Sequence, residues 1–541
     1  MDRAVEPVLA IEGLTLGLPA MADRRYAVES VSLAIGAGET LCVVGESGSG
    51  KSMIAHAVMG LLPKAVRPIG GSIRLAGRNL LALDELAMQD VRGREIGMIF
   101  QEPMTSLNPV MRVGEQIIET FEAHGLHTRA ERLSRAVALL AEVGLPDPTR
   151  LARVYPHELS GGQRQRVMIA MALALEPKLL IADEPTTALD VTTQAQILKL
   201  LDNLRHKHGT AVLFITHDMG VVAEIADRIA VLEMGVLVEE GTADQVLGTP
   251  RHVYTQKLLA AVPSLVPPHR PALSDSTPVL SVQGLCKVYR KRSLFGARRE
   301  VKAADDISFT LARGETLGLV GESGSGKSTV GRCCLRLIEP NSGRIALGDL
   351  VLSDLGASAL REHRKRIQMV FQDPFASLNP RQTVGRIISD GPVAHGVARG
   401  AALAKARELL ELVGLSANAF DRYPHEFSGG QRQRIGIARA LALEPDVLVA
   451  DEAVSALDVS VQAQILTLIK EIQQRLGLAI LFVTHDLRVA AQICDRIAVM
   501  QHGQVVETGK TAAIFANPQH DYTRQLLAAV PGGTRFGGSP A

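Results

Sequence analysis

The chain has 541 residues, and its 58 Lys and Arg residues against 57 Asp and Glu residues give a formal net charge of +1. This length predicts two or more domains, and the balanced charge argues against a protein that coats nucleic acid, because neutralising phosphates requires a basic excess. No run of apolar residues is long enough to span a membrane, and the N-terminus lacks the pattern of a secretory signal.

The five cysteines of the sequence form no CxxC pair and no Cys/His cluster. We therefore expect buried, reduced thiols, with neither a zinc nor an iron–sulfur site.

The first motif is a glycine-rich loop between an apolar run, ETLCVV, and a helical pattern, SMIAHAVMGLL. A strand, a GxxxxGK[ST] loop and a helix in this order predict a phosphate-binding loop, whose backbone N–H groups point at phosphate oxygens. Lys51 is expected to reach the terminal phosphates, and the Ser52 hydroxyl is expected to ligate Mg²⁺. The predicted nucleotide-binding residues are Gly45, Glu46, Ser47, Gly48, Ser49, Gly50, Lys51 and Ser52.

The second motif is SGGQ, where Ser160, Gly161 and Gly162 open the helical pattern VMIAMALAL. Exposed N–H groups and a hydroxyl at a helix start predict a second anion site. An ordinary serine N-cap remains the alternative for this segment.

Two further apolar runs end in polar residues, KLLIADE at Asp183 and Glu184 and FITHD at His217. Strands that end beside a phosphate loop place their last residues at the nucleotide crevice. We expect Asp183 to hold Mg²⁺ through water, Glu184 to polarise the attacking water, and His217 to sense the γ-phosphate. A lone histidine after a strand more often has only a structural role.

All of these motifs recur in the second half of the chain. Lys327 follows Lys51 by 276 positions, whereas the later motifs recur with a constant offset of 268 positions, which indicates a duplicated domain. The corresponding residues are Gly321, Glu322, Ser323, Gly324, Ser325, Gly326, Lys327, Ser328, Ser428, Gly429, Gly430, Asp451, Glu452 and His485.

Between the copies lies SLVPPHRPALSDSTP, whose four prolines and lack of apolar periodicity predict an extended linker. The predicted organisation is a first domain over residues 1–263, a linker over 264–278, a second domain over 279–531 and a flexible tail over 532–541.

Taken together, these motifs resemble the nucleotide-binding subunits of ABC transporters over nearly the whole chain, twice. The resemblance implies an α/β fold with two P-loop NTPase (ABC ATPase) domains in tandem, each with a RecA-like core and a helical subdomain. It implies that Gln101 and Gln372 act in catalysis and contact Mg²⁺, and that ATP is hydrolysed. It also implies that the two cassettes pair within the chain, so that each ATP lies between one phosphate loop and the opposite SGGQ segment, and that the segments beginning at Ala188 and Ala456 are the D-loops.

Some positions depart from the family pattern. Tyr289 matches the aromatic residue that stacks on adenine, whereas Leu18 stands at the corresponding first-domain position and Tyr26 is the nearest substitute. Ala453 and Val454 replace the usual Pro-Thr pair after the acidic residues. No phosphate ligand is lost, so we expect weaker adenine stacking at the first site and catalysis at both.

The FQ[ED]P…SLNP segments and the YT…LLAAVP tails are similar to those of the oligopeptide, dipeptide and nickel class of bacterial importers. The fused chain resembles the tandem ATPases of glutathione importers and of microcin/peptide importers. This implies two membrane-spanning permease subunits, a periplasmic substrate-binding protein and a peripheral position on the cytoplasmic face of the inner membrane, without nucleic acid. The alternatives are a tandem ATPase acting on the ribosome, which would need a charged linker and a basic surface, and a sugar-importer ATPase, which would lack these segments. DNA-repair ATPases would carry zinc modules or coiled-coil insertions.

Overall fold

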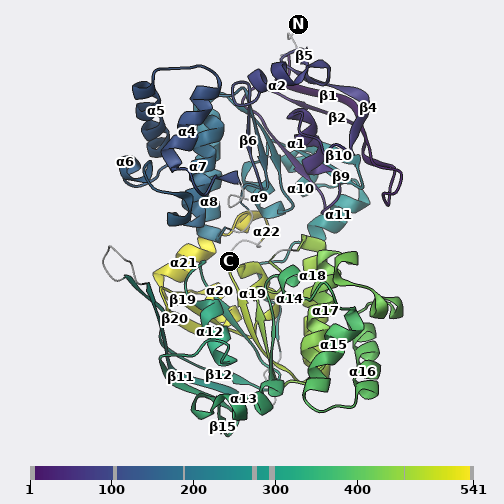
Figure 1. Ribbon diagram of the computed structural model, residues 1–541, viewed down its shortest axis with the longest axis vertical. Coiled ribbons are helices and arrows are strands. Elements are labelled where there is room, and N and C mark those ends of the chain that lie inside the picture. Colours follow the sequence, from purple (N-terminus) through teal and green to yellow (C-terminus); the bar gives the residue numbers. More distant parts are fainter. Residues whose placement is uncertain are drawn as a thin grey trace. The chain divides into compact units, whose positions relative to one another are not determined.

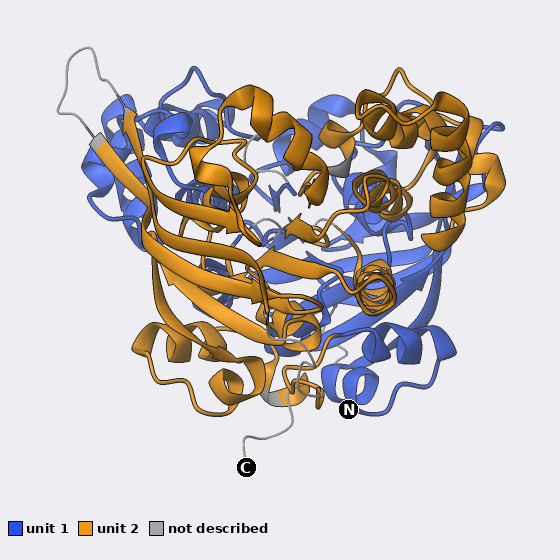
Figure 2. Cartoon of the chain, turned by 90° about the horizontal axis from the view of Figure 1, so that it is seen from below, with its two compact units in different colours: residues 1–189, 193–262 blue, residues 190–192, 263–541 orange. Residues whose placement is uncertain are grey.

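The computed structural model describes residues 6–101, 106–186, 189–270, 277–291, 299–455 and 457–536. The chain forms two compact units, the first of residues 1–189 and 193–262 and the second of residues 190–192 and 263–541 (Figures 1 and 2). Each unit combines a four-stranded and a six-stranded sheet with helices, so the predicted fold of two tandem α/β domains is confirmed.

In the first unit, a six-stranded sheet with the order β10-β9-β3-β8-β7-β6 provides the framework of the site. Five of its strands are parallel, and β10 pairs with β9 in the antiparallel sense. Because the carboxyl ends of parallel strands meet at one edge, the residues that follow β3, β7 and β8 are brought together there. The strands of this sheet are β3 (Thr40–Val44), β6 (Ile96–Ile99), β7 (Leu179–Asp183), β8 (Ala211–Ile215), β9 (Arg228–Glu233) and β10 (Val236–Thr242).

An antiparallel sheet with the order β2-β1-β4-β5 completes this half of the unit, and α1 packs on both sheets. Ile54, Ala55 and Val58 of α1 are fully buried in one core with Leu14 of β1 and Leu213 of β8. The helical subdomain implied by the family resemblance lies between Gln101 and Ser160 and contains α4, α5 and α6. The elements are β1 (Leu9–Gly17), β2 (Tyr26–Ile35), β4 (Arg67–Leu75), β5 (Arg78–Asn79), α1 (Lys51–Val58), α2 (Glu85–Val91), α4 (Val113–Ala123), α5 (Arg129–Glu142), α6 (Pro148–Leu151), α7 (Gly161–Leu173), α8 (Val191–His208), α9 (Met219–Ile225), α10 (Ala243–Gly248) and α11 (Val253–Ala260).

The second unit repeats this plan, with the sheet orders β16-β17-β18-β13-β19-β20 and β12-β11-β14-β15. Its strands are β11 (Pro278–Lys291), β12 (Arg299–Ala312), β13 (Thr316–Val320), β14 (Ser342–Leu347), β15 (Leu350–Val351), β16 (Ile367–Val370), β17 (Val447–Asp451), β18 (Ala479–Thr484), β19 (Arg496–Gln501) and β20 (Gln504–Lys510). Its helices are α12 (Lys327–Cys334), α13 (Ala357–His363), α14 (Pro374–Ser377), α15 (Val384–Ala394), α16 (Arg399–Leu412), α17 (Gly429–Leu441), α18 (Val459–Leu476), α19 (Leu487–Ile493), α20 (Thr511–Ala516), α21 (Asp521–Ala528) and α22 (Gly533–Phe536).

Among the described residues, none of the helices combines the length and the apolar character required to cross a membrane. The cysteines are unpaired, and four of them are buried. Cys286 is only partly buried because it lies on β11 in the antiparallel sheet, where its Sγ accepts a hydrogen bond from Asp306 N at 3.3 Å.

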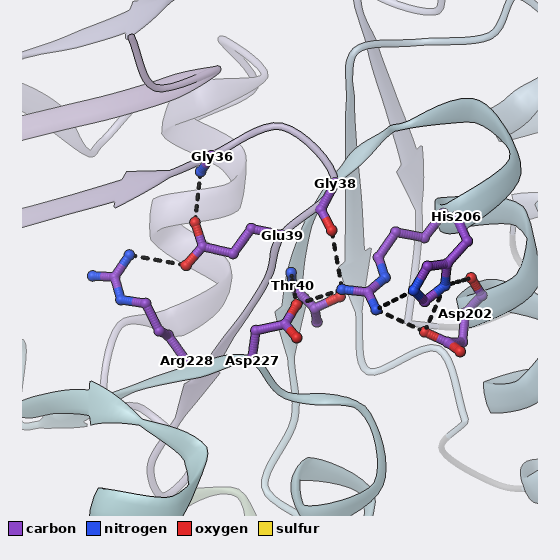
Figure 3. A network of polar contacts seen from close by, with 9 residues as sticks. Gly36, Gly38, Glu39, Thr40, Asp202, His206, Asp227 and Arg228 are labelled. Atoms are coloured by element: carbon purple, nitrogen blue, oxygen red, sulfur yellow. Dashed lines mark hydrogen bonds and ion pairs between the residues drawn. The ribbon is translucent and has the colours of Figure 1, made fainter. Parts of the chain in front are cut away.

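A polar network fixes the amino end of β3 in the first unit, at the sheet edge opposite the phosphate loop (Figure 3). Asp227 Oδ2 accepts hydrogen bonds from Thr40 N at 2.8 Å and from Arg205, whose guanidinium also donates to Gly38 O and Asp202 Oδ1, each at 3.0 Å. Arg205 is 9% exposed, whereas the side chain of Asp227 is 49% exposed, so solvent reaches the ion pair from the aspartate side. The network joins α8, β3 and the turn before β9.

The second unit builds the same network with a cation from outside the duplicated domain. Asp495 again accepts from Thr316 N at 2.8 Å, but Gln473 occupies the position of Arg205. The missing cation is Arg270, which donates to Asp495 Oδ1 at 3.1 Å and to Ile493 O at 2.7 Å. Residues 264–270, predicted as extended linker, are therefore bound to the second unit.

Two further contacts hold this segment. Gln492 Nε2 donates to Ser264 O at 2.7 Å and to Val266 O at 3.1 Å, and Leu265 packs against the core of the second unit. We call residues 264–270 the strap.

Replacing Arg270 with alanine is expected to destabilise the second unit by about 1–2 kcal/mol, because charge-assisted hydrogen bonds to Asp495 and Ile493 are lost. Adding Gln473→Arg should restore part of this stability, since an arginine there can reach Asp495 as Arg205 reaches Asp227. Urea unfolding of the full chain, with hydrogen exchange to assign each transition to a unit, measures both effects. An Arg270→Ala chain with parental stability would contradict the role of the strap.

The C-terminal segment also differs from the predicted flexible tail. Gly533–Phe536 form α22, because buried Arg488 donates to Pro531 O and its guanidinium carbon lies 5.7 Å from the centre of the Phe536 ring. Residues 537–541 of the predicted tail lie outside the described residues.

Candidate functional site

Each unit carries its glycine-rich loop between a buried strand and a helix, joining β3 to α1 in the first unit and β13 to α12 in the second. The last glycine of each loop has a positive φ, 101° at Gly50 and 106° at Gly326. A Cβ atom would lie 2.6 Å from Ala27 O at Gly50 and 1.8 Å from Ala303 O at Gly326. Only glycine fits these positions, so the helix begins directly at the loop lysine.

The loop lysines are buried and hold the loop in its curved form. Lys51 Nζ donates to Gly45 O at 2.7 Å and to Glu46 O at 2.9 Å, and Lys327 Nζ makes the corresponding two bonds at 2.8 and 2.7 Å. Burial lowers the pKa of Lys327 below its ordinary value, and this effect outweighs the nearby carboxylates, which raise the pKa. A buried ammonium wrapped by a loop is suited to an anionic partner.

Two loop hydroxyls also fit an anion. Ser49 Oγ and Ser325 Oγ are buried and make no hydrogen bond within the described residues. A buried hydroxyl without a partner is costly, so a ligand with acceptor oxygens would satisfy both positions. Together with Lys51 and Lys327, these hydroxyls match the polyphosphate of a nucleotide.

The loop serines contact the aspartates that end β7 and β17. Ser52 Oγ donates to Asp183 Oδ1 at 3.1 Å, and Ser328 Oγ donates to Asp451 Oδ1 at 2.7 Å. Burial raises the pKa of both aspartates above the ordinary value, against the lowering effect of these hydrogen bonds.

The residues around Asp451 fit a hard divalent cation. Asp451 Oδ2 is buried and accepts no hydrogen bond, and Arg332 Nη2 lies 3.5 Å away. No cluster of three His, Cys, Asp or Glu side chains suited to a metal occurs in the described part of the chain. A magnesium ion here would take the serine and aspartate oxygens with phosphate and water, which is the usual shell for Mg²⁺ at a nucleotide.

The glutamates that follow have unusual backbone geometry. Glu184 and Glu452 have φ values of 47° and 46°, and their N–H groups donate to Ile215 O and Val483 O, each at 2.9 Å. A left-handed conformation at a residue other than glycine costs about 1 kcal/mol or more and persists where the surroundings impose it. The turn directs both carboxylates along the sheet edge that carries the loop.

The carboxylate of each glutamate lies between a glutamine and a histidine. Gln101 Nε2 donates to Glu184 Oε2 at 3.0 Å, and His217 Nδ1 lies 3.0 Å from Glu184 Oε1. In the second unit, the corresponding distances to Glu452 are 2.7 Å from Gln372 and 3.3 Å from His485. The structure thus brings together the predicted glutamine, glutamate and histidine of each unit.

Glu452 and His485 are close enough to form an ion pair, since His485 Nδ1 lies 3.3 Å from Glu452 Oε1. Burial alone would raise the pKa of Glu452 and lower the pKa of His485. Their mutual interaction outweighs burial, so the pKa of Glu452 is lowered and that of His485 is raised. The ion pair therefore persists at pH values where a free histidine would be neutral.

The SGGQ segments begin α7 and α17. Gln163 N donates to Ser160 Oγ at 3.3 Å while Ser160 N donates to the Gln163 side chain at 3.0 Å, and Ser428 forms the same capping box. The N-cap that the sequence left open is thus present in both units, with both serines exposed. A Cβ atom at Gly162 or Gly430 would lie 2.5 or 2.2 Å from the next helix, whereas Gly161 has open space around its Cα.

Tyr289 lies on β11 and is 40% exposed, with Lys287 Nζ 5.4 Å from its ring centre. In the first unit, Leu18 packs partly buried against the core, and Tyr26 lies beneath the Arg25 guanidinium. The predicted D-loop residues Ala188 and Ala456 lie outside the described residues.

Two basic side chains of the site were not predicted from the sequence. Arg24, from the loop between β1 and β2, donates to Gly48 O of the phosphate loop. Arg332 of α12 faces Asp451, whereas His56 occupies the equivalent position in α1. A single arginine in a loop or on a short helix gives no pattern by which to identify it.

Comparisons with known proteins agree with this geometry. The family described as ABC transporter matches residues 28–187 and 304–455, and the family described as oligopeptide/dipeptide transporter, C-terminal region, matches residues 238–292 and 506–534. The chain is 50% identical over 557 residues to the glutathione import ATP-binding protein GsiA of Salmonella choleraesuis (strain SC-B67), with 97% of this chain and 89% of that protein covered. The protein of the same name from Escherichia coli O157:H7 is 49% identical over 561 residues, with the same shares covered.

Proposed function

Because the chain belongs to the ABC transporter family, we propose that it is the ATP-hydrolysing subunit of a bacterial importer for peptides of the dipeptide, oligopeptide or glutathione type. The observation that carries this proposal is the convergence, in each unit, of a phosphate loop, an aspartate and a Gln–Glu–His group at one sheet edge. The chain binds ATP and is an ATPase.

The chemistry assigned to each residue follows from its contacts. The loop N–H groups and lysines bind the β- and γ-phosphates, and Glu184 or Glu452 orients and deprotonates the attacking water. Gln101 and Gln372 hold these carboxylates, while His217 and His485 lie beside them and would contact the γ-phosphate. When bound, Mg²⁺ would neutralise phosphate charge, with Ser52, Asp183 and Gln101 in the first unit and Ser328, Asp451 and Gln372 in the second as the residues that hold it.

Further nucleotide contacts belong to the same proposal. The exposed hydroxyls of Ser160 and Ser428 and the adjoining glycines would bind phosphate oxygens, and Tyr289 would stack on adenine. Leu18 offers no ring, so adenine would be bound more weakly in the first unit.

The substrate class rests on the C-terminal region, which matches the oligopeptide/dipeptide transporter family in both units. The same match favours peptide import over the alternatives of a ribosome-associated ATPase and a sugar-importer ATPase. The proposed partners are two permease subunits and a periplasmic binding protein, with this chain peripheral on the cytoplasmic face of the inner membrane.

Uptake measurements in a strain lacking the gene test the proposal. The parental chain should restore ATP-dependent uptake of labelled glutathione or a labelled dipeptide, whereas a chain with both Glu184→Gln and Glu452→Gln should not. If the parental chain is expressed and hydrolyses ATP but restores uptake of neither glutathione nor the dipeptide, the assignment to peptide import is contradicted.

A further inference from the structure

A tyrosine from the C-terminal part of each unit contacts the phosphate loop. Tyr254 of α11 accepts a hydrogen bond on its hydroxyl from Glu46 N at 3.0 Å, and Tyr522 of α21 accepts one from Glu322 N at 3.1 Å. Both rings are nearly buried, at 9% and 5% exposure. More than 190 residues separate each tyrosine from its loop, so the contact is a product of the fold.

The bond fixes one residue at the entrance of the loop. The N–H of Glu322 is bound by Tyr522, and the carbonyl of the same residue is bound by Lys327 Nζ at 2.7 Å. Glu46 is held between Tyr254 and Lys51 in the same way. The carbonyl of this residue also accepts a hydrogen bond from within the loop, from Ser325 N at 3.2 Å in the second unit and from Ser49 N at 3.1 Å in the first. The residue is therefore held on both sides and anchors the curve of the loop.

The helices that carry the tyrosines are themselves held by hydrogen bonds to the preceding strand. On β20, Glu507 accepts hydrogen bonds from Gln519 N at 2.8 Å and His520 N at 3.1 Å, and His520 is the N-cap of α21. Glu239 of β10 makes the equivalent bonds to Arg251 N and His252 N at 2.7 and 3.0 Å. The strand, the start of the helix and the loop are therefore connected by hydrogen bonds in both units.

The hydroxyl of Tyr522 carries its proton at neutral pH. Burial raises the pKa of Tyr522 to about 12, and the nearby Glu322 carboxylate acts in the same direction, against the lowering effect of the Glu322 N–H. Tyr522 is thus a permanent acceptor for that N–H and a donor with its own hydrogen.

From these contacts we infer that Tyr254 and Tyr522 are positioning residues for nucleotide binding, through which the C-terminal region of each unit sets the shape of the phosphate loop. The inference rests on the proposed function, since it assigns ATP to these loops. It gives the YT…LLAAVP segment a role within the ATPase itself, in addition to marking the class of importer.

Tyr522→Phe removes only the hydroxyl oxygen and leaves Glu322 N–H buried without its acceptor. We expect ATP and ADP to bind the second site about 5- to 10-fold more weakly, with a raised KM and a nearly unchanged kcat. The reason is that the loop must be reordered before the nucleotide binds, which affects the bound ground state and the transition state of hydrolysis equally. Calorimetry on the full chain carrying Lys51→Ala, which silences the first loop, measures the dissociation constant of the second site alone. Tyr254→Phe in a Lys327→Ala background tests the first.

Tyr423→Phe is the matched control, because Tyr423 is 42% exposed and belongs to a different segment of the same unit. The melting temperature without nucleotide distinguishes a positioning role from a purely structural one. If Tyr522 is purely structural, Tyr522→Phe lowers the melting temperature and leaves the nucleotide affinity at the parental value, and this result would overturn the inference. If Tyr522→Phe does not fold, Glu507→Gln is measured instead, and parental affinity overturns the inference there too. Failure of the parental chain to bind ATP would refute the proposed function first.

Discussion

Replacing Glu452 with glutamine is expected to lower hydrolysis at the second site by about 10²- to 10⁴-fold, while ATP binding stays close to the parental value. The carboxylate lies between Gln372 at 2.7 Å and His485 at 3.3 Å, so it is held in one orientation. Glutamine preserves the size of the side chain but cannot accept a proton from water. The strained φ of 46° is kept, since it is imposed by the backbone hydrogen bond to Val483 O.

Single-turnover phosphate release with the full chain measures this effect, and calorimetry measures the retained affinity. Glu184→Gln should produce the same loss at the first site. Glu471→Gln, on the exposed side of α18, is the matched control and should leave both quantities unchanged. If the chain with both Glu184→Gln and Glu452→Gln hydrolysed ATP at the parental rate, the assignment of these glutamates would be wrong.

Replacing Lys327 with alanine is expected to weaken ATP binding at the second site by about 100-fold. The change removes a buried charge that would face the phosphates, and it also removes the hydrogen bonds that Lys327 Nζ donates to Gly321 O and Glu322 O. Each charge-assisted hydrogen bond contributes about 1.5–3 kcal/mol, so the loss of phosphate contacts alone accounts for this factor.

Equilibrium dialysis with labelled ATP measures the number and strength of the remaining sites. The variant should bind one ATP with parental affinity and one far more weakly. Lys470→Ala removes an equally sized cation from an exposed helix position and should leave both sites intact. Two sites of parental affinity in Lys327→Ala would exclude the loop lysine as a phosphate ligand.

The fold and most of the site are predictable from local patterns. The strand, glycine loop and helix around Lys51 are contiguous in the sequence, and parallel strands necessarily bring their carboxyl ends together, so the meeting of Asp183 and Glu184 with the loop follows. The duplication strengthened each inference, because a chance motif does not recur with its neighbours at a constant offset.

Contacts between distant segments were not predictable in the same way. The YT segment was recognised as a mark of the importer class, yet nothing in its letters shows that the tyrosine hydroxyl reaches Glu46 or Glu322. Arg24 and Arg332 gave no signal because single arginines are common on surfaces. The left-handed glutamates were also missed, since the sequence assigns them to the end of a strand and the fold imposes their φ.

The linker shows how composition can mislead. Prolines and small polar residues predict an extended chain, but a segment of that composition can still donate side chains to a neighbour, as Arg270 does. In the sequence, this role of the linker is indicated by Gln473, which stands where the first unit has Arg205. The difference can be interpreted only after the two units are compared.

The strap determines where this protein could be divided into two genes. A break in the proline-rich stretch beyond residue 270 would leave Arg270 on the first polypeptide, and the second polypeptide would be translated without the cation that its Asp495 requires. A break between the end of α11 at Ala260 and Ser264 would instead keep the strap on the same polypeptide as Asp495 and Gln492, which it contacts. The position at which the gene could be split into two ATPase genes therefore lies before the proline-rich stretch.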